Sequence, residues 1–255
     1  KGRPRQRASR HARRAPLPPY LEARDISLAY PPEDAARTRR LATLIALAVT
    51  LAVAALILLA ALGLPADAAS IPRAMQAHRS LILRAARTSS WGMAAPVAVL
   101  AAQIHQESKG DDHARSPVGA MGLAQIMPAT ATWLAETHPE LGRPDSLNPA
   151  WAVRALCAYD RWIWERVRGA ASDCDRWAMT LASYNGGLGW VLKKRAAAAR
   201  LGLESGRWWD QVEAVDVGRA RSAEAENRGY PRLILLKHQP LYRAWGPGVA
   251  CEVRP

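Results

Sequence analysis

The 255-residue chain predicts an all-α domain preceded by a single transmembrane helix and a disordered basic tail. Three observations predict this: an N-terminal segment rich in Arg and Pro, a long stretch without charge, and a remainder without sustained apolar–polar alternation. With 49% hydrophobic residues, the chain has ample material for a core, which excludes a wholly disordered protein. A formal net charge of +13 favours polyanions or membrane surfaces as partners.

Residues 1–40 predict a disordered, basic, cytoplasmic tail. They hold eleven basic and four acidic side chains and several prolines, with little apolar periodicity. No nucleic-acid motif or interleaved aromatic residue accompanies these charges, so we expect no nucleic-acid partner. The chain begins with Lys1 rather than Met, and we expect its natural start to lie elsewhere.

Residues 41–64 predict a transmembrane helix, because they form 24 consecutive uncharged residues. A helix of that length reaches roughly 36 Å, and a bilayer core needs roughly 30 Å. Arg37, Arg39 and Arg40 flank the span, so the positive-inside rule predicts a single-pass protein with a cytoplasmic N-terminus and with the following domain across the membrane. The Ala-Asp-Ala sequence at 66–68 fits a signal-peptidase site, and export after signal cleavage is the alternative.

The rest of the chain predicts a linker with a leading helix over 65–92 and a helical domain over 93–255. Gly and Pro punctuate its apolar periodicity. We expect one helix from about 95 to 108 and a second over 148–167, opened by an Asn-Pro cap. A third helix, over 175–184, should end at the Asn-Gly-Gly that follows it.

Three cysteines are too few for a disulfide scaffold, and without a CxxC pair they argue against structural zinc. An exported compartment permits one disulfide. Cys157 and Cys174 lie on consecutive predicted helices joined by a short turn, which could bring them together. Pairings with Cys251 stay open, and one thiol is left over in any case.

Glu107 is the first candidate for chemistry. It lies three residues after Ile104 and continues the apolar face of its helix, so its carboxyl should point inward. Burial raises the pKa of a carboxylic acid, and a carboxyl protonated near neutral pH can act as a general acid. The alternative is a Glu that merely lies near a helix C-terminus.

Two further segments carry polar groups next to glycines. In SPVGAMGLAQIMPATA, Gly119 and Gly122 should form a tight loop whose backbone can approach a ligand, with Gln125 at the start of the next helix. In ASYNGGLGWV, Tyr184 and Asn185 offer donors and acceptors for a sugar. Each segment alone would also suit an ordinary loop or helix cap.

The order and spacing of QESKG, GAxGLxQIMPxTA and AxYNGG within about eighty residues closely resemble the catalytic domain of the soluble lytic transglycosylase (SLT) family, with its lysozyme-like fold. The resemblance covers roughly residues 94–243, and the end of the chain is similar to phage or prophage-encoded members. It implies that Glu107 is the catalytic acid, that the membrane is the bacterial inner membrane and that the catalytic domain is periplasmic. The positions that match the family's substrate-binding residues are Ser116, Gln125, Tyr184, Asn185, Glu226 and Tyr230. The chain departs from the family at Ala124, where Met is usual, and at Pro231.

The resemblance further implies cleavage of the β-1,4 bond between N-acetylmuramic acid and N-acetylglucosamine in peptidoglycan strands, for wall degradation, lysis or remodelling. One carboxyl would suffice, 1,6-anhydro-muramoyl ends would form, and no metal or cofactor would be needed. Two alternatives stay open. A goose-type-like lysozyme would hydrolyse the bond with help from Asp111 or Asp112, and a noncatalytic membrane-anchored protein would only bind the wall.

Overall fold

The computed structural model describes Arg37, Arg40, Leu41 and residues 43–51 and 70–252. The chain divides into two compact units, Lys1–Ala68 and Ala69–Pro255.

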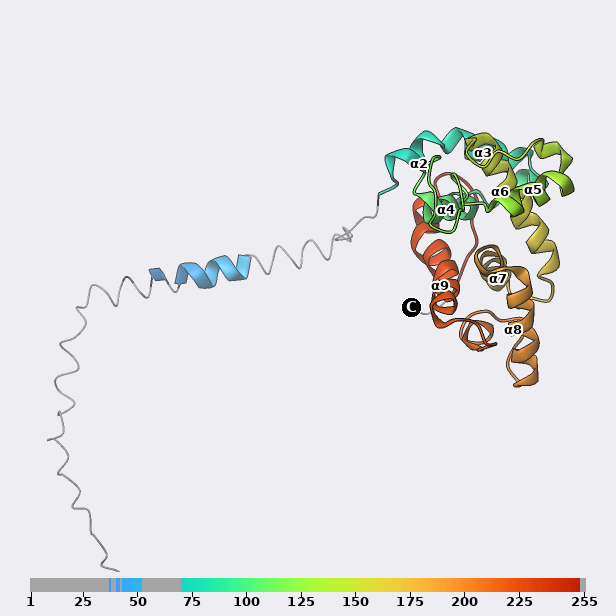
Figure 1. The fold of residues 1–255 in the computed structure, drawn as a ribbon. Helices are drawn as coiled ribbons and strands as arrows, with labels where there is room; N and C mark the ends of the chain where they lie inside the picture. Colours follow the sequence, from blue (N-terminus) through green and yellow to red (C-terminus); the bar gives the residue numbers. More distant parts are fainter. Residues whose placement is uncertain (1–36, 38–39, 42, 52–69, 253–255) are drawn as a thin grey trace, which may run out of the picture. The chain divides into compact units, whose positions relative to one another are not determined.

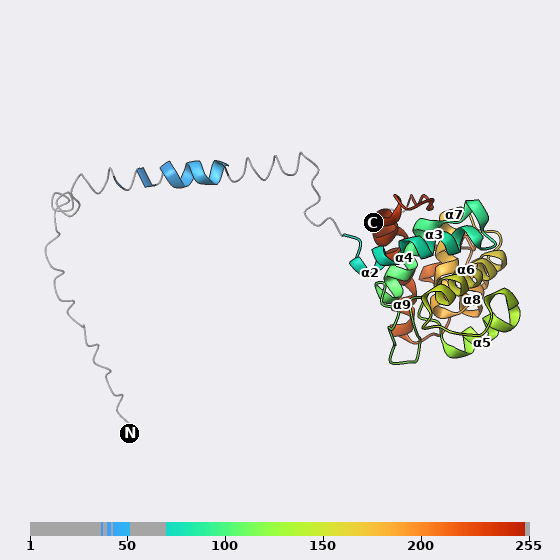
Figure 2. The same ribbon diagram turned by 90° about the horizontal axis from the view of Figure 1, so that it is seen from above.

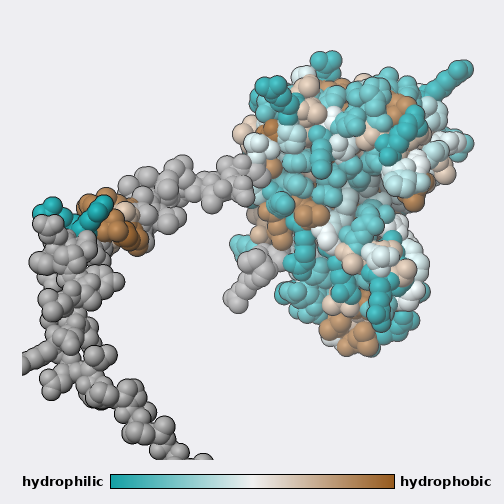
Figure 3. All heavy atoms as spheres, turned by 60° about the vertical axis from the view of Figure 1, so that its left-hand side comes forward, coloured by the Kyte–Doolittle hydropathy of each residue, from teal (hydrophilic) through white to brown (hydrophobic). Residues whose placement is uncertain are grey.

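In the first unit, the described residues are helical and expose their apolar side chains (Figure 3). Among all described residues, none of the helices combines the length and apolar character needed to cross a membrane. The remainder of the predicted span, Ala42 and residues 52–64, lies outside the described residues, as does nearly all of the predicted basic tail.

The second unit consists of helices and loops, and no strand occurs within its described part, which confirms the all-α prediction there (Figures 1 and 2). Two isolated antiparallel bridges, Arg115 with Met121 and Met121 with Ile126, shape the loop before α5. The α-helices are α2 (Arg73–Ala77), α3 (Arg79–Thr88), α4 (Val97–Ser108), α5 (Pro128–Thr137), α6 (Pro149–Arg166), α7 (Asp173–Gly186), α8 (Leu188–Arg200), α9 (Arg221–Arg232) and α10 (Gln239–Tyr242). Short 3₁₀ turns are Gly92–Ala94, Pro139–Leu141 and Val212–Ala214, and Leu233–His238 (η5) is π-helical.

The helix α4 lies in the core of this unit. All residues from Val97 to Ile104 are buried. All of them except Gln103 are apolar, so this part of the helix is apolar on every side. It packs against α3, η5 and α10. It starts two residues later than predicted, with Pro96 as the N-cap, and ends before Lys109, whose φ of 56° is left-handed. A buried, well-packed α4 gives Glu107 a rigid base.

The predicted helix caps are confirmed at α6. The Asn148 side chain accepts hydrogen bonds from the backbone of Ala150 and Trp151 at 2.9 and 3.2 Å, and Pro149 occupies the first turn. The next helix, α7, extends two residues beyond the predicted range at each end. Ser172 caps it by accepting from Asp175 N at 3.1 Å, which moves its start to Asp173.

The prediction that Gln125 begins a helix is wrong. Its backbone has a φ of 46°, which a right-handed helix cannot contain. The helix α5 begins instead at Pro128, whose fixed φ suits the first helical position. Gln125 therefore belongs to the loop that precedes α5.

The loop before α5 that contains Gly119 and Gly122 is the glycine loop. At Gly122 its backbone approaches another backbone segment of the protein closely. Gly122 has a φ of 72°, and a Cβ there would lie 1.8 Å from the carbonyl oxygen of Ser146. Gly119 has a φ of 93°, and a Cβ there would meet nothing within 4 Å. The loop needs both glycines for backbone conformation, and Gly122 also lets two backbone segments touch.

The late helix contains the unusual Pro231. Proline has no N–H for the regular helical ladder, and here it is buried inside α9. The backbone continues as the π-helix η5 and then as α10, so the three elements form one continuous helical stretch with a local change of winding. The helix α9 packs against α7, beside which it lies in Figure 1.

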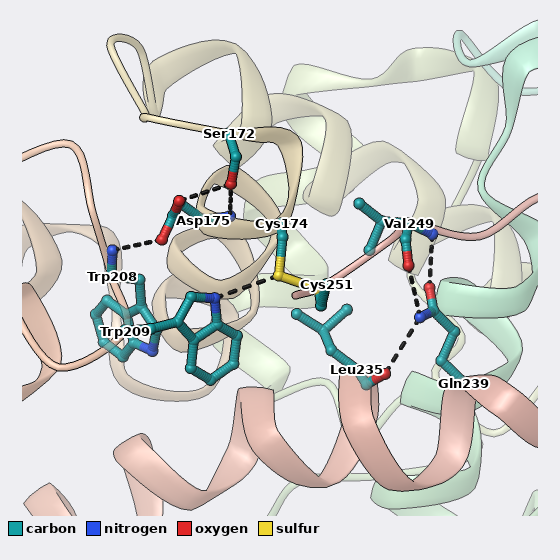
Figure 4. Close-up of a disulfide and its surroundings, with 9 residues drawn as sticks. All are labelled: Ser172, Cys174, Asp175, Trp208, Trp209, Leu235, Gln239, Val249 and Cys251. Carbon is teal, nitrogen blue, oxygen red and sulfur yellow. Dashed lines mark hydrogen bonds between the residues drawn. A yellow bond between two sulfur atoms is a disulfide. The ribbon is translucent and has the colours of Figure 1, made fainter. Parts of the chain in front are cut away.

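The predicted pairing of Cys157 with Cys174 is wrong, since Cys174 bonds to Cys251 (Figure 4). The Cys157 thiol is free and fully buried within α6, away from the turn. Gln239 brings Cys251 to its partner: its amide accepts from Val249 N at 2.7 Å and donates to Val249 O at 2.9 Å. These bonds fix the segment that leads to Cys251 near the head of α7.

Candidate active site

One cleft of about 260 Å³ brings together six of the seven predicted site residues. Its walls come from the end of α4, the glycine loop, α5, α6, α7 and α9. The lining residues are Glu107, Ser116, Val118, Ala120, Gln125, Ile126, Met127, Thr130, Tyr159, Tyr184, Asn185 and Glu226. Tyr230, the seventh, is buried and contacts the cleft through Glu107.

Glu107 lies in the last turn of α4, partly buried, with its carboxyl held by one neighbour. The Tyr230 hydroxyl donates a hydrogen bond to Glu107 Oε1. Burial raises the pKa of Glu107 to about 7, the Tyr230 hydrogen bond lowers it, and the nearby charge of Glu226 raises it. The carboxyl can therefore hold a proton below neutral pH and release it near neutrality, as a general acid requires.

Ser116 and Gln125 shape the wall formed by the glycine loop. Ser116 Oγ accepts a hydrogen bond from Ala120 N at 2.9 Å, which closes the loop's first turn. Gln125 Nε2 donates to the carbonyls of Ala114 and Gly122 at 3.2 and 2.9 Å, across the base of the loop. Both side chains line the cleft and also stabilise the loop conformation.

The opposite wall is formed where α7 meets α9. Tyr184 donates through its hydroxyl to Ala124 O at 2.7 Å, which ties α7 to the glycine loop. Asn185 Nδ2 donates to Glu226 Oε1 at 2.9 Å, while Asn185 Oδ1 accepts from Asn227 at 3.2 Å. The Tyr-Asn pair is thus anchored by the glycine loop and by α9.

Tyr159 lies in the cleft but is not among the site residues predicted from the sequence. This residue of α6 lines the cleft, and its ring centroid lies 5.2 Å from that of Tyr184 and 5.8 Å from that of Trp133. Aromatic faces at a cleft suit the apolar faces of sugar rings. In the sequence, Tyr159 is an aromatic residue on a predicted helix that is followed by Asp160, and neither feature distinguishes it from its neighbours.

The chemistry available in the cleft is proton transfer beside a polar ligand. A carboxyl with a raised pKa faces amide, hydroxyl and aromatic groups. Within residues 37–51 and 70–252, as far as they are described, no group of three or more His, Cys, Asp or Glu side chains could hold a metal ion. The carboxyl and the polar groups around it suit acid–base cleavage of a hydroxyl-rich substrate.

The chain is similar in sequence to proteins named as lytic transglycosylases. The chain is 34% identical over 115 residues to the membrane-bound lytic murein transglycosylase F of Maricaulis maris, covering 45% of this chain and 24% of that protein. It is 32% identical over 134 residues to the protein of the same name from Shewanella woodyi, covering 52% and 26%. The chain thus spans about a quarter of the length of these relatives. The 70-kDa soluble lytic transglycosylase of Escherichia coli, a solved structure, is 23% identical with a TM-score of 0.46, covering 66% of this chain and 24% of that chain.

The family comparison covers most of the cleft. Residues 85–204 match the family model described as the transglycosylase SLT domain. That range includes Glu107, the glycine loop and the Tyr184–Asn185 pair, while Glu226 and Tyr230 lie beyond it. By this match, residues 85–204 of the chain are similar to the transglycosylase SLT domain.

Proposed function

We propose that this chain is a peptidoglycan lytic transglycosylase, which cleaves the β-1,4 bond between N-acetylmuramic acid and N-acetylglucosamine and leaves 1,6-anhydro-muramoyl ends. The observation that carries this proposal is Glu107, a partly buried carboxyl with a pKa raised to about 7, lining a cleft in a domain of this family. The names of the relatives, lytic murein transglycosylases, support the choice of substrate.

In the proposed mechanism, Glu107 acts twice. Its carboxyl first donates a proton to the glycosidic oxygen, and the C1–O bond breaks while the N-acetyl group of the substrate stabilises the positive charge at C1. The carboxylate then accepts the proton of the muramoyl C6 hydroxyl as that oxygen bonds to C1. The proton count closes without water. A pKa near neutrality suits a group that gives and regains one proton.

The other cleft residues would bind the glycan. Ser116, Gln125 and Asn185 present hydroxyl and amide groups of the kind that pair with sugar hydroxyls and N-acetyl groups. Tyr184 and Glu226 would complete the binding site on the opposite wall. Tyr230 would orient Glu107 through its hydrogen bond.

Hydrolysis is the second candidate. Asp111 and Asp112 do not line the cleft, and Asp111 Oδ1 accepts from His113 N at 2.9 Å within an exposed turn, which argues against a water-positioning role for this pair. Glu226 does line the cleft and could play the part of a second carboxylate. Its carboxyl is engaged by Asn185, which favours a binding role instead.

Product analysis separates the two reactions. Purified peptidoglycan sacculi are digested and the released fragments are weighed by mass spectrometry. A transglycosylase gives ends about 18 Da lighter than hydrolysed ends, because no water is added. If wild type instead releases fragments with reducing ends, and Glu226→Gln releases none, the protein would be a two-carboxylate hydrolase.

Glu107→Gln is the matched inactive variant. The near-isosteric amide keeps the shape of the side chain but cannot deliver a proton, so cleavage should be lost while the fold is kept. Turbidity of purified walls and circular dichroism measure the two properties. Wild-type turnover by Glu107→Gln would contradict the mechanism, and a wild-type protein that binds walls without clearing them would identify a noncatalytic wall-binding protein.

We also propose that the domain acts outside the cytoplasm, anchored by residues 41–64 behind a basic tail. The Arg residues before that segment support this orientation, and the Cys174–Cys251 disulfide supports an oxidising compartment. A reporter fused after residue 255 should be active only in the periplasm. Recovery of soluble protein that begins at Ala69 would favour signal cleavage over a retained anchor.

A further inference from the structure

Asp160 is a fully buried carboxyl without a charge partner. It lies on α6 and its exposed fraction is 0%. Its one hydrogen bond comes from Gln103 Nε2, which donates to Asp160 Oδ1 at 3.3 Å. No Lys, Arg or His of the described residues forms a salt bridge with it. A single neutral amide does not offset the loss of hydration of a carboxylate, so burial favours the protonated acid.

Two unpaired oxygens show where that proton would go. Asp160 Oδ2 and Gln103 Oε1 are both buried without a hydrogen-bond partner. With an ionised Asp160 both atoms are acceptors, and neither can satisfy the other. A proton on Oδ2 turns it into a donor for Gln103 Oε1. One proton thus satisfies both oxygens and closes a ring of two hydrogen bonds between an acid and an amide.

This pair lies directly beside the candidate catalytic group. Gln103 and Glu107 are four residues apart on α4 and share one face of that helix. Burial raises the pKa of Asp160 well above its usual value, the Gln103 hydrogen bond lowers it, and the charge of Glu107 raises it further.

None of the ionisable groups that interact with Asp160 is cationic. They are Glu107 of α4, Cys157 and Tyr159 of α6, Tyr184 of α7 and Tyr230 of α9.

We propose that Asp160 is a positioning residue that stays protonated at neutral pH, pairs with Gln103, and fixes the face of α4 from which Glu107 reaches the cleft. The neutrality of the Asp160 carboxyl matters to the reaction, and this part of the inference rests on the proposed function. When Glu107 delivers its proton it becomes an anion, and a second carboxylate beneath it would oppose that change. Asp160 is not exposed to the cleft, so it does not itself meet the sugar or water.

The protonated state can be tested by the pH dependence of stability. In the unfolded chain Asp160 ionises above pH ~4, whereas the folded protein keeps its proton. Wild type should therefore lose stability relative to Asp160→Asn as pH rises, by about tenfold in the unfolding equilibrium constant per pH unit. The Asn variant keeps both hydrogen bonds, and Glu107 is present in both proteins, so its own titration cancels. Denaturant unfolding from pH 4 to 8 measures the difference, and a flat difference would overturn the proposal.

Infrared spectroscopy tests the same proton without the Asn variant. Glu107→Gln removes the other carboxyl whose pKa is raised. At pH 8 this protein should still show the C=O band of a protonated carboxylic acid, and the band should vanish in Glu107→Gln/Asp160→Asn. No such band in Glu107→Gln would refute the protonated pair. Neither measurement depends on cleavage, so a failure here is separate from a failure of the proposed function.

The positioning role is tested by comparing two substitutions. Asp160→Leu has similar bulk but leaves both Gln103 polar atoms unpaired, which should displace α4 and lower kcat about tenfold relative to Asp160→Asn. KM should change less, because Asp160 does not line the cleft. Equal kcat values for folded Leu and Asn variants would overturn the positioning role.

Discussion

The Glu107 carboxyl is tuned by two neighbours that act in opposite directions. The hydrogen bond from Tyr230 stabilises the carboxylate, whereas the charge of Glu226 destabilises it, and burial outweighs both. In the proposed mechanism, the acid form of Glu107 must be present for the first proton transfer. The alkaline limb of the activity profile should therefore follow the pKa of Glu107, with kcat/KM falling as pH rises above about 7.

Tyr230→Phe should move that limb to higher pH. Without the donor, the carboxylate loses a hydrogen bond, its pKa rises, and the protonated form persists further into the alkaline range by about one pH unit. The pH dependence of kcat/KM measures the shift. Tyr242→Phe is the matched control, because the Tyr242 hydroxyl contacts His105 on the same helix and not Glu107. A limb that stays in place, or moves down, would contradict this assignment.

Glu226→Gln should move the same limb to lower pH. Removing a nearby negative charge makes ionisation of Glu107 easier, so its pKa falls. The Gln side chain keeps an oxygen that can accept from Asn185, which limits the structural change. Opposite shifts in Tyr230→Phe and Glu226→Gln, measured in the same buffers, would identify Glu107 as the titrating group. Shifts of the same sign would exclude it.

At the scale of elements, local signals predicted the helices and long-range contacts decided the exceptions. The Asn148 cap, the apolar periodicity of α4 and the glycines after α7 are local, and they predicted these helices to within about two residues. Gln125 was assigned to a helix because its left-handed φ leaves no mark in the sequence. The six cleft residues were found through spacing, whereas Tyr159 was missed because its role depends on packing between α6 and α7.

The glycine loop offers a paired test of backbone requirements. A Cβ at Gly119 would face open space. Gly119→Ala should therefore lower the free energy of unfolding by about 1 kcal/mol, because of the left-handed backbone alone. Gly122→Ala adds a clash of its Cβ with Ser146 O, so it should cost more and should also displace the loop that carries Ser116 and Gln125. Thermal unfolding and activity of both variants make the comparison. Equal losses of stability would show that the contact with Ser146 relaxes freely.

At the scale of the whole molecule, the disulfide joins residues 77 positions apart. The sequence allowed this pairing but could not select it, because the choice depends on Gln239 holding the segment around Val249. Cys157, which forms no disulfide, lies on α6 and is buried in the hydrophobic core. Spacing along a chain carries no information about such a closure.

Reduction of the disulfide should destabilise the protein strongly. Opening a loop of this length restores chain entropy to the unfolded state worth about 4 kcal/mol. Thermal unfolding with and without reductant should show a large shift for wild type and none for Cys251→Ser, which already lacks the bond. Cys157→Ser should respond to reductant as wild type does. An unchanged midpoint for reduced wild type would show that packing alone holds the segment.

The partners of α4 come from far along the chain and in reverse order. Ala98 N donates to Pro247 O, His105 meets Tyr242, Gln106 meets His238, and Glu107 meets Tyr230. During synthesis, the helix that bears Glu107 must therefore wait for more than 120 later residues before its environment is complete. A nascent or half-exported chain would have the carboxyl without the setting that tunes it. The order of assembly would thus withhold the proposed activity until the late helical stretch has arrived, a form of latency that needs no inhibitor.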